Sequence, residues 1–217
     1  MKKKISLILL IFAFSISGCI AETLTADTLL WVGEEPVLFR DDFSKEAGGW
    51  TTRDDTLSFA GYDQSGFRLW SNVPDYQFWS LPGLNFKDVL LYVRARKQAG
   101  PDNNLFGLLC RYQNEENFYA LVIGSDGYYG IFKRVEGEQS LIAQKHMDFS
   151  EAIHRGDAVN EIQAICQADQ LALFVNETRL LQVQDNSLGY GDVGLIIGNF
   201  EESGIDILFD DFIVVNP

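Results

Sequence analysis

The chain has 217 residues, and its formal net charge is −14 at pH 7. This length allows one domain with a substantial core, and the acidic balance repels nucleic acid and anionic lipid headgroups, so we expect no nucleic-acid partner. The chain has 19 glycines, only 5 prolines and 13% aromatic residues. This composition suits an all-β domain with many tight turns.

The first 19 residues have the layout of an export signal. Lys2–Lys4 are positively charged, Ile5–Ile16 is largely apolar, and small residues precede Cys19. The apolar run of about 12 residues is shorter than the roughly 20 that span a bilayer, which disfavours an uncleaved anchor helix. An ordinary secretory signal with an incidental cysteine is the alternative.

The Ile16-Ser17-Gly18-Cys19 segment resembles a bacterial lipobox. The resemblance implies cleavage before Cys19 and a diacylglycerol on its thiol, so that acyl chains such as palmitate would hold the protein on a membrane, outside the cytoplasm. Cleavage would remove 3 of the 17 basic residues and leave 14 against 31 acidic ones, a net charge of about −17. We therefore expect a signal peptide at 1–18, a lipidated tether at 19–35 and one domain at 36–217.

From residue 37 onward, short apolar runs alternate with Gly, Asn and Asp, which is typical of β-strands and tight turns. In Val89–Arg96, for example, every second residue is apolar, so one face of the strand packs and the other meets solvent or ligand. About a dozen such runs predict a two-sheet antiparallel β-sandwich. The predicted strands are Gly66–Ser71, Tyr76–Leu81, Val89–Lys97, Leu105–Tyr112, Phe118–Ile123, Tyr128–Val135, Ser140–Gln144, Asn160–Cys166, Leu171–Val175, Arg179–Gln184, Gly194–Gly198 and Ile205–Val215.

Two cysteines remain once Cys19 is assigned to lipid. Cys110 and Cys166 each lie in an apolar run, and an exported protein is in an oxidising setting. A disulfide between neighbouring strands is one interpretation. Two buried thiols that pack as small apolar residues are the other.

A series of motifs extends over nearly the whole domain and resembles the concanavalin A-like lectin/glucanase superfamily, in its laminin-G-like and DUF1080-like branch. The resemblance implies a jelly-roll sandwich in which a curved sheet often carries a glycan site on its concave face. It does not imply catalysis, because the fold serves both lectins and hydrolases. The motifs are Leu38–Ser44, Gly49-Trp50, Asp88–Lys97, Phe106–Tyr112, Asn117–Tyr119, Gly127–Gly130, Leu173–Asn176, Gly191–Leu195 and Phe209–Phe212.

The sequence lacks the catalytic motif of the superfamily's retaining glucanases, E-x-D-x-x-E on one strand. His146 and His154 have no neighbouring Cys, Asp or Glu at zinc-ligand spacing. We therefore expect no enzyme activity. A hydrolase built from scattered carboxylates such as Glu115 and Asp126 is the alternative.

The resemblance also suggests a structural calcium ion where the first and last strands meet. Asp41 near the start of the domain and Asp211 in the last strand would supply carboxylates. Calcium needs six to eight oxygens, so two carboxylates are not sufficient. Aspartates that accept hydrogen bonds from backbone amides are the alternative.

A sugar site needs flat rings for the apolar faces of the sugar and polar groups for its hydroxyls. Arg68 and Trp70 share one face of a predicted strand, and Trp79 lies on the next. With Arg111 and Tyr128 they are the predicted ligand-binding residues.

The resulting hypothesis is a lipid-anchored, non-catalytic carbohydrate-binding protein whose partner is a glycan or another cell-envelope component. A protein-interaction or structural module of the cell envelope is the alternative from a different class.

Overall fold

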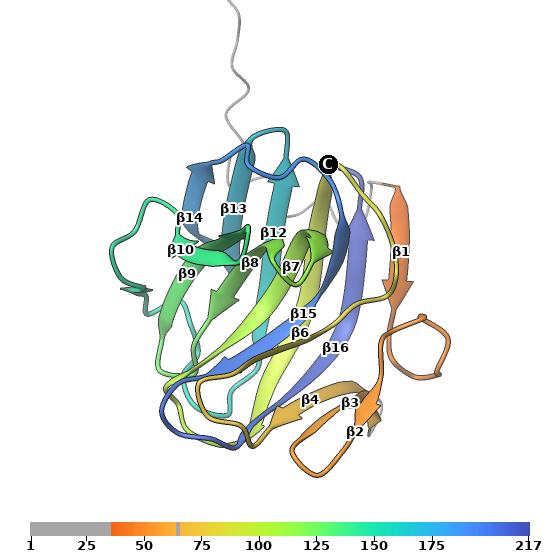
Figure 1. Cartoon of the computed structure of the whole chain (residues 1–217), viewed down its shortest axis with the longest axis vertical. Coiled ribbons are helices and arrows are strands. Elements are labelled where there is room, and N and C mark those ends of the chain that lie inside the picture. The colour runs from red at the N-terminus through yellow and green to blue at the C-terminus, as the bar shows by residue number, and fades with distance from the viewer. Residues whose placement is uncertain (1–35, 64–65) are drawn as a thin grey trace, which may run out of the picture.

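The computed structural model describes residues 36–63 and 66–217. The described residues form 16 β-strands in two antiparallel sheets, so the predicted jelly-roll β-sandwich is confirmed (Figure 1). No helix in this part of the chain is long and apolar enough to cross a membrane. The predicted signal peptide, the lipidated Cys19 and the tether lie outside the described residues.

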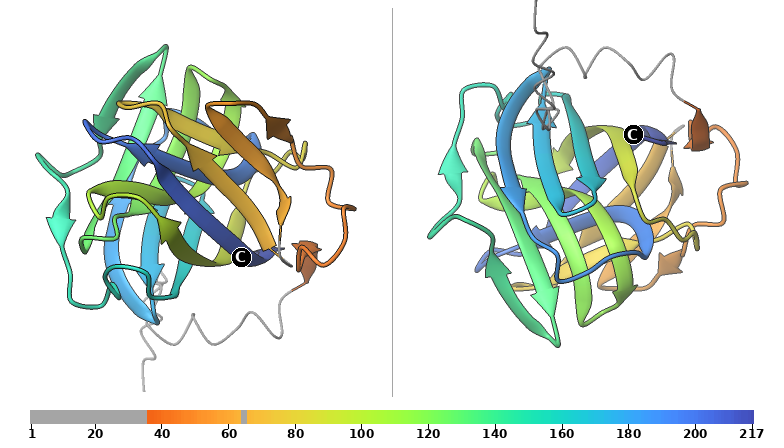
Figure 2. Two further views of the ribbon diagram at one scale, coloured as in Figure 1. Left: turned by 90° about the horizontal axis from the view of Figure 1, so that it is seen from below. Right: turned by 90° about the horizontal axis from the view of Figure 1, so that it is seen from above.

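One layer is a nine-stranded sheet. Its strands in spatial order are β14 (Thr178–Gln184), β13 (Gln170–Val175), β12 (Asn160–Gln167), β6 (Val89–Ala99), β16 (Ile205–Val215), β4 (Gly66–Ser71), β3 (Ser58–Asp63) and β2 (Arg53–Asp54), with β1 (Val37–Asp41) also paired to β16. β1 lies beside the C-terminus in all three views (Figures 1 and 2), and the Asn216 amide donates to the Pro36 carbonyl at 3.3 Å. The described part of the chain therefore begins, at Pro36, next to the last strand.

The other layer is a seven-stranded sheet. Its strands in spatial order are β10 (Glu138–Leu141), β9 (Tyr128–Val135), β8 (Asn117–Ile123), β7 (Asn104–Asn114), β15 (Asp192–Asn199) and β5 (Gln77–Ser80), with β11 (Asp148–Phe149) also paired to β9. Neighbours in space are often distant in sequence. β5, for example, pairs with β15, more than 100 residues later.

The main core lies between the sheets, where the inward side chains of both layers meet. In β6, Val89, Leu91, Val93 and Ala95 are all buried there, as their alternation predicts. A disulfide joins Cys110 of β7 to Cys166 of β12. These strands belong to opposite sheets, so the bond ties the two layers together rather than neighbouring strands.

The outer face of the seven-stranded sheet carries a second buried apolar cluster. Leu105 and Leu109 of β7, Ala120 and Val122 of β8, and Ile196 of β15 point outward and are at most 3% exposed. Partly buried aromatic residues pack on the cluster, among them Trp79, Tyr112, Phe132 and Phe200. This face therefore has an apolar centre with aromatic rings around it.

The seven-stranded sheet is concave on this outer face. β5 and β8 are separated in the sheet by β15 and β7, so a flat sheet would place them roughly 14 Å apart, at about 4.8 Å for each neighbour. Yet the rings of Trp79 on β5 and Phe118 on β8 have centroids only 5.5 Å apart. Side chains from distant strands therefore meet over this face because the sheet curves toward them; in the same way Arg134 of β9 reaches Gln77 of β5, with Nη2 2.8 Å from Oε1.

Candidate functional site

Three aromatic rings form the floor of the concave face. Trp79 lies 5.5 Å from Phe118 and 6.0 Å from Tyr112, and Tyr112 stacks on Phe118 at 5.8 Å with an angle of 20° between the ring planes. Phe118 is fully buried, whereas Trp79 and Tyr112 are partly exposed. The two partly exposed rings thus rest on an apolar base that holds their orientation.

A cleft of about 750 Å³ opens beside Trp79. Its size lies in the range of pockets that hold small ligands, about 300–1,000 Å³. The cleft combines one partly exposed indole ring with amides, carboxylates and one guanidinium. Its polar and aromatic lining includes Asp75, Tyr76, Gln77, Trp79, Glu115, Glu116, Arg134, Gln139 and Asn199.

Arg134 forms one wall of the cleft. Its guanidinium lies 4.9 Å from the centroid of the Phe118 ring and 6.0 Å from that of Trp79. Nη2 donates to Gln77 Oε1 at 2.8 Å and to Gln139 Oε1 at 2.7 Å. Burial lowers the pKa of Arg134, but an arginine remains charged at neutral pH. The site therefore has a cation held in place by the amide oxygens of Gln77 and Gln139.

Asn199 supplies an unused hydrogen-bond donor at the opposite side of the cleft. The residue is 4% exposed, and its Oδ1 accepts from the Tyr76 amide at 3.2 Å. Its Nδ2 has no partner among the described residues. A buried donor without a partner costs about 1–3 kcal/mol. The buried Nδ2 is therefore a polar atom beside the cleft whose hydrogen-bonding capacity is unused among the described residues.

Arg111 is not a ligand-side residue, and this prediction is wrong. The side chain is 2% exposed, and it donates to the carbonyls of Leu188 at 2.9 Å and Ala168 at 2.8 Å. Strict alternation would place it on the outer face, next to the inward Cys110. Instead Arg111 lies in a β-bulge, where β7 shifts register against β15 and its φ is 53°. The extra residue of a bulge redirects a side chain, and here it turns the guanidinium into the protein.

Arg68 and Trp70 do share a face, but on the other sheet. β4 belongs to the nine-stranded sheet and presents both side chains outward, whereas Trp79 belongs to the seven-stranded sheet. Arg68 pairs with Asp206 through Nε at 2.9 Å and Nη2 at 2.6 Å. The predicted grouping of Arg68 and Trp70 with Trp79 is therefore wrong, because consecutive strands lie in different layers.

Tyr128 is exposed, as predicted, but it lies away from the cleft. Its side chain is 44% exposed and meets Phe149 edge-on at 5.7 Å. It begins β9 at the turn after β8, whereas the cleft lies near the opposite ends of these strands, at Glu115 and Arg134. Of the five predicted ligand-binding residues, only Trp79 lines the cleft.

The two aspartates of the predicted calcium site have other partners. Asp41 accepts from the Phe43 amide at 2.7 Å and from Trp50 Nε1 and Tyr62 Oη, each at 3.0 Å. Asp211 lies 3.6 Å from the Arg94 guanidinium. The described residues contain no group of three His, Cys, Asp or Glu side chains that could hold a metal. Calcium binding stays a prediction from the resemblance, and a comparison of melting temperatures in calcium and in chelator tests it.

The carboxylates suggested for a hydrolase do not form a pair. Glu115 precedes β8 and Asp126 follows it, so the length of this seven-residue strand, roughly 23 Å, separates them. Glycosidases place their two carboxyl groups about 5–9.5 Å apart. The outward positions at the centre of β7, β8 and β15 carry Leu, Ala, Val, Ile and Gly, so no carboxylate rises from the described centre of the concave face.

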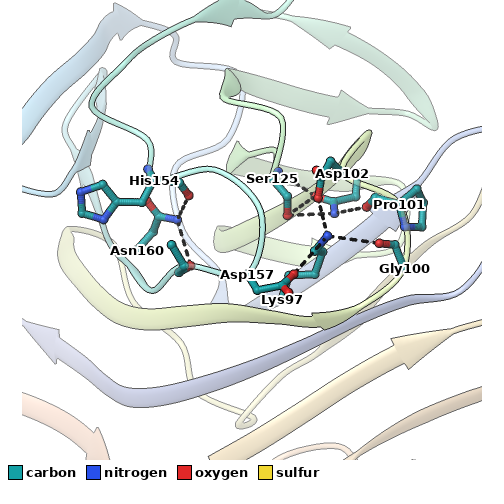
Figure 3. A network of polar contacts seen from close by, with 10 residues as sticks. Lys97, Gly100, Pro101, Asp102, Ser125, His154, Asp157 and Asn160 are labelled. Carbon is teal, nitrogen blue, oxygen red and sulfur yellow. Dashed lines mark hydrogen bonds and ion pairs between the residues drawn. The ribbon is translucent and has the colours of Figure 1, made fainter.

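A polar network at another edge of the sandwich is structural (Figure 3). The buried Lys97 ammonium binds the Gly100 carbonyl at 3.2 Å, the Asp102 carboxylate, and the Asp157 carboxylate at 3.2 Å. Nearby, Asn160 donates to the His154 carbonyl at 2.8 Å. The Lys97 ammonium neutralises the two carboxylates. Through it the network joins the loop at 100–104 to the loop at 154–160.

Arg134, Gln77 and Asn199 are site residues that the sequence reasoning missed. Alternation in β9 places Arg134 on the same face as Phe132, which was a usable signal. Nothing in the sequence showed that this face is the concave one. Gln77 and Asn199 come from strands that meet only through the pairing of β5 with β15.

Comparison with known proteins gives matches in structure alone, since no protein-family model and no curated protein matches the sequence. Similar solved structures include the carbohydrate-binding module CBM66 from Bacillus subtilis, with 15% identity, a TM-score of 0.62, and coverage of 79% of this chain and 98% of that one. A Bacillus subtilis protein of unknown function with a galectin-like fold has 12% identity, a TM-score of 0.61 and coverage of 84% and 97%. The Bacillus licheniformis β-glucanase has 10% identity, a TM-score of 0.57 and coverage of 82% and 98%. These similarities show the fold: the chain is a jelly-roll β-sandwich, as are these carbohydrate-binding, galectin-like and glucanase structures.

Proposed function

We propose that the protein is a lipid-anchored, non-catalytic carbohydrate-binding protein that binds a glycan in the cleft beside Trp79. The observation that carries the proposal is the composition of this cleft: a supported indole ring beside the Arg134 guanidinium, with the amides of Gln77 and Gln139 next to it. A sugar has apolar faces, which can pack on the indole ring of the cleft. It also has hydroxyl groups at its edges, which can form hydrogen bonds with the polar side chains of the lining. The fold is consistent with this function and also with hydrolysis.

The non-catalytic part of the proposal rests on the separation of Glu115 from Asp126 and on the apolar centre of the concave face. The lipid anchor rests on the lipobox-like segment that ends at Cys19. The tether joins β1 of the nine-stranded sheet, whereas the cleft belongs to the other layer. A protein held by this tether can therefore present the cleft to glycans outside the cytoplasm.

The test of binding is a glycan array probed with the mature chain carrying Cys19→Ser, which lacks the lipid. We expect saturable binding that Trp79→Ala abolishes. The matched control is Trp70→Ala, which removes the same type of partly exposed ring from the other sheet and should leave binding intact. If the Trp70 variant loses binding and the Trp79 variant keeps it, the site lies on the nine-stranded sheet instead.

The test of anchoring is membrane fractionation of cells that express the full chain or its Cys19→Ser variant. We expect the parent chain in the membrane fraction with acyl lipid on its N-terminal cysteine, and the variant released. A Cys19→Ser protein that stays in the membrane fraction would contradict lipid anchoring.

A further inference from the structure

A second cleft lies directly across the aromatic floor from the first. Its volume is about 430 Å³, and its lining includes Leu84, Asn85, Tyr112, Gln113 and Tyr190. This volume also falls in the range of pockets that hold small ligands. Trp79 lines the first cleft and Tyr112 lines the second, and their ring centroids are 6.0 Å apart. The two clefts are therefore neighbouring compartments with one pair of rings between them.

The second compartment has walls held by hydrogen bonds. The Asp192 carboxylate accepts from the amides of Gly83 at 3.0 Å and Leu84 at 2.9 Å. Phe86 and Gly191 exchange two backbone hydrogen bonds, at 2.8 and 2.9 Å. The loop after β5 is thus tied to the start of β15, and the shape of the compartment is set before a ligand binds.

Tyr190 is the exposed ring of this compartment. Its side chain is 58% exposed, although its carbonyl accepts from Gln113 Nε2 at 3.2 Å and Gly191 next to it is fixed to Phe86. An exposed ring on an anchored backbone gives a ligand contact area at a small entropy cost. Trp79, Tyr112 and Tyr190 thus supply rings in both compartments.

The charges of the residues that line the two compartments indicate which kind of oligosaccharide fits. The first compartment has the acidic residues Asp75, Glu115 and Glu116 and one arginine, and the carboxylate in the second is Asp192. Polyuronate or sulfated chains would meet net repulsion, whereas an uncharged chain would not.

We infer that the two compartments form one groove that binds an uncharged linear oligosaccharide through several consecutive units, rather than a single terminal sugar. This inference rests on the proposed function and adds the ligand class. The ligand passes over the Trp79–Tyr112 pair, with one part beside Arg134 and the other beside Tyr190.

The test is calorimetric titration of the mature Cys19→Ser chain with cello-, xylo- and laminari-oligosaccharides from disaccharide to hexasaccharide, and with oligogalacturonates as the acidic series. We expect the affinity for a neutral series to rise with chain length, and no binding of the acidic series. Tyr190→Ala should weaken the hexasaccharide about tenfold and leave the disaccharide unchanged, whereas Trp79→Ala should weaken every length. Tyr128→Ala, an exposed ring outside both compartments, is the matched control, and melting temperatures verify that each variant is folded.

Each of the other outcomes contradicts one part of the inference: the extended groove, the uncharged ligand, or the proposed function on which both rest. Affinity that is equal for disaccharide and hexasaccharide, or a Tyr190→Ala variant that binds the hexasaccharide like the parent, overturns the extended groove and leaves the proposed function standing. Preferential binding of oligogalacturonates overturns the uncharged ligand class. Failure of the parent chain to bind any of these oligosaccharides overturns the groove, and an array on which no glycan binds overturns the proposed function as well.

Discussion

Replacement of Arg111 by Met distinguishes a structural arginine from a ligand-binding one. The guanidinium donates to three backbone carbonyls, those of Lys87, Ala168 and Leu188, at 2.8 to 3.2 Å. It also lies 3.4 Å from the Asp88 carboxylate. Methionine fills similar space but donates no hydrogen bond, so these acceptors would lose their partner inside the protein.

The expected loss of stability is about 3–5 kcal/mol. An unsatisfied buried polar group costs about 1–3 kcal/mol, and removal of one partner from a buried charged network costs about 3–5 kcal/mol. Asp88 contributes little, because its side chain is 32% exposed and can be hydrated. For a domain of this size about 1 kcal/mol corresponds to a shift of about 2–4 °C, so the melting temperature should fall by roughly 10 °C.

Thermal unfolding followed by near-UV circular dichroism measures this fall. Arg96→Met is the matched control, because Arg96 is an exposed arginine on β6, and a surface substitution changes stability by about 0.5 kcal/mol at most. A variant at Arg111 that melts within about 2 °C of the parent would refute the structural role. Loss of glycan binding at unchanged stability would restore the original prediction.

Three further predictions concern stability. Reduction of the disulfide, or replacement of Cys110 and Cys166 by Ala, should cost about 2–4 kcal/mol, because the bond spans a sequence separation of 56 residues; melting that a reductant leaves unchanged would contradict this. Burial raises the pKa of Asp185, but hydrogen bonds led by that from Lys133 outweigh burial and hold the pKa well below 3.8. Its contribution to stability is therefore present above about pH 4 and lost as the pH falls below that, and Asp185→Asn should flatten this acid dependence in melting curves; an equal slope in both proteins would exclude the mechanism. Lys97→Met should destabilise the domain by about 2–3 kcal/mol in urea unfolding, because the ammonium has one carbonyl and two carboxylate partners; an unchanged midpoint would show that the network adds nothing.

Much of the fold could be predicted from local pattern. The alternation in Val89–Arg96 separates inward residues from outward ones, and the structure places them so, although the outward Leu90 is also buried, in an apolar cluster apart from the main core. β3 was not predicted, since Ser58–Asp63 contains only Phe59, Ala60 and Tyr62 as apolar residues and a glycine among them. β3 is a strand because its backbone pairs with β4, a contact that its own apolar pattern does not predict.

The candidate site depended on information that alternation does not contain. Alternation states which residues share a face of one strand, and this was correct for Arg68 and Trp70. It does not state to which sheet the strand belongs, and it fails wherever a bulge adds a residue, as at Arg111.

The sequence by itself determined most of the strands, the inward and outward sides of most of these, and the two cysteines that could pair. Only the tertiary structure decided that β5 joins β15, that the seven-stranded sheet curves, and that Trp79, Arg134 and Asn199 therefore line one cleft. The physical reason is that the faces of a strand follow from backbone geometry between adjacent residues, whereas the pairing and curvature of sheets follow from contacts between residues far apart in the chain.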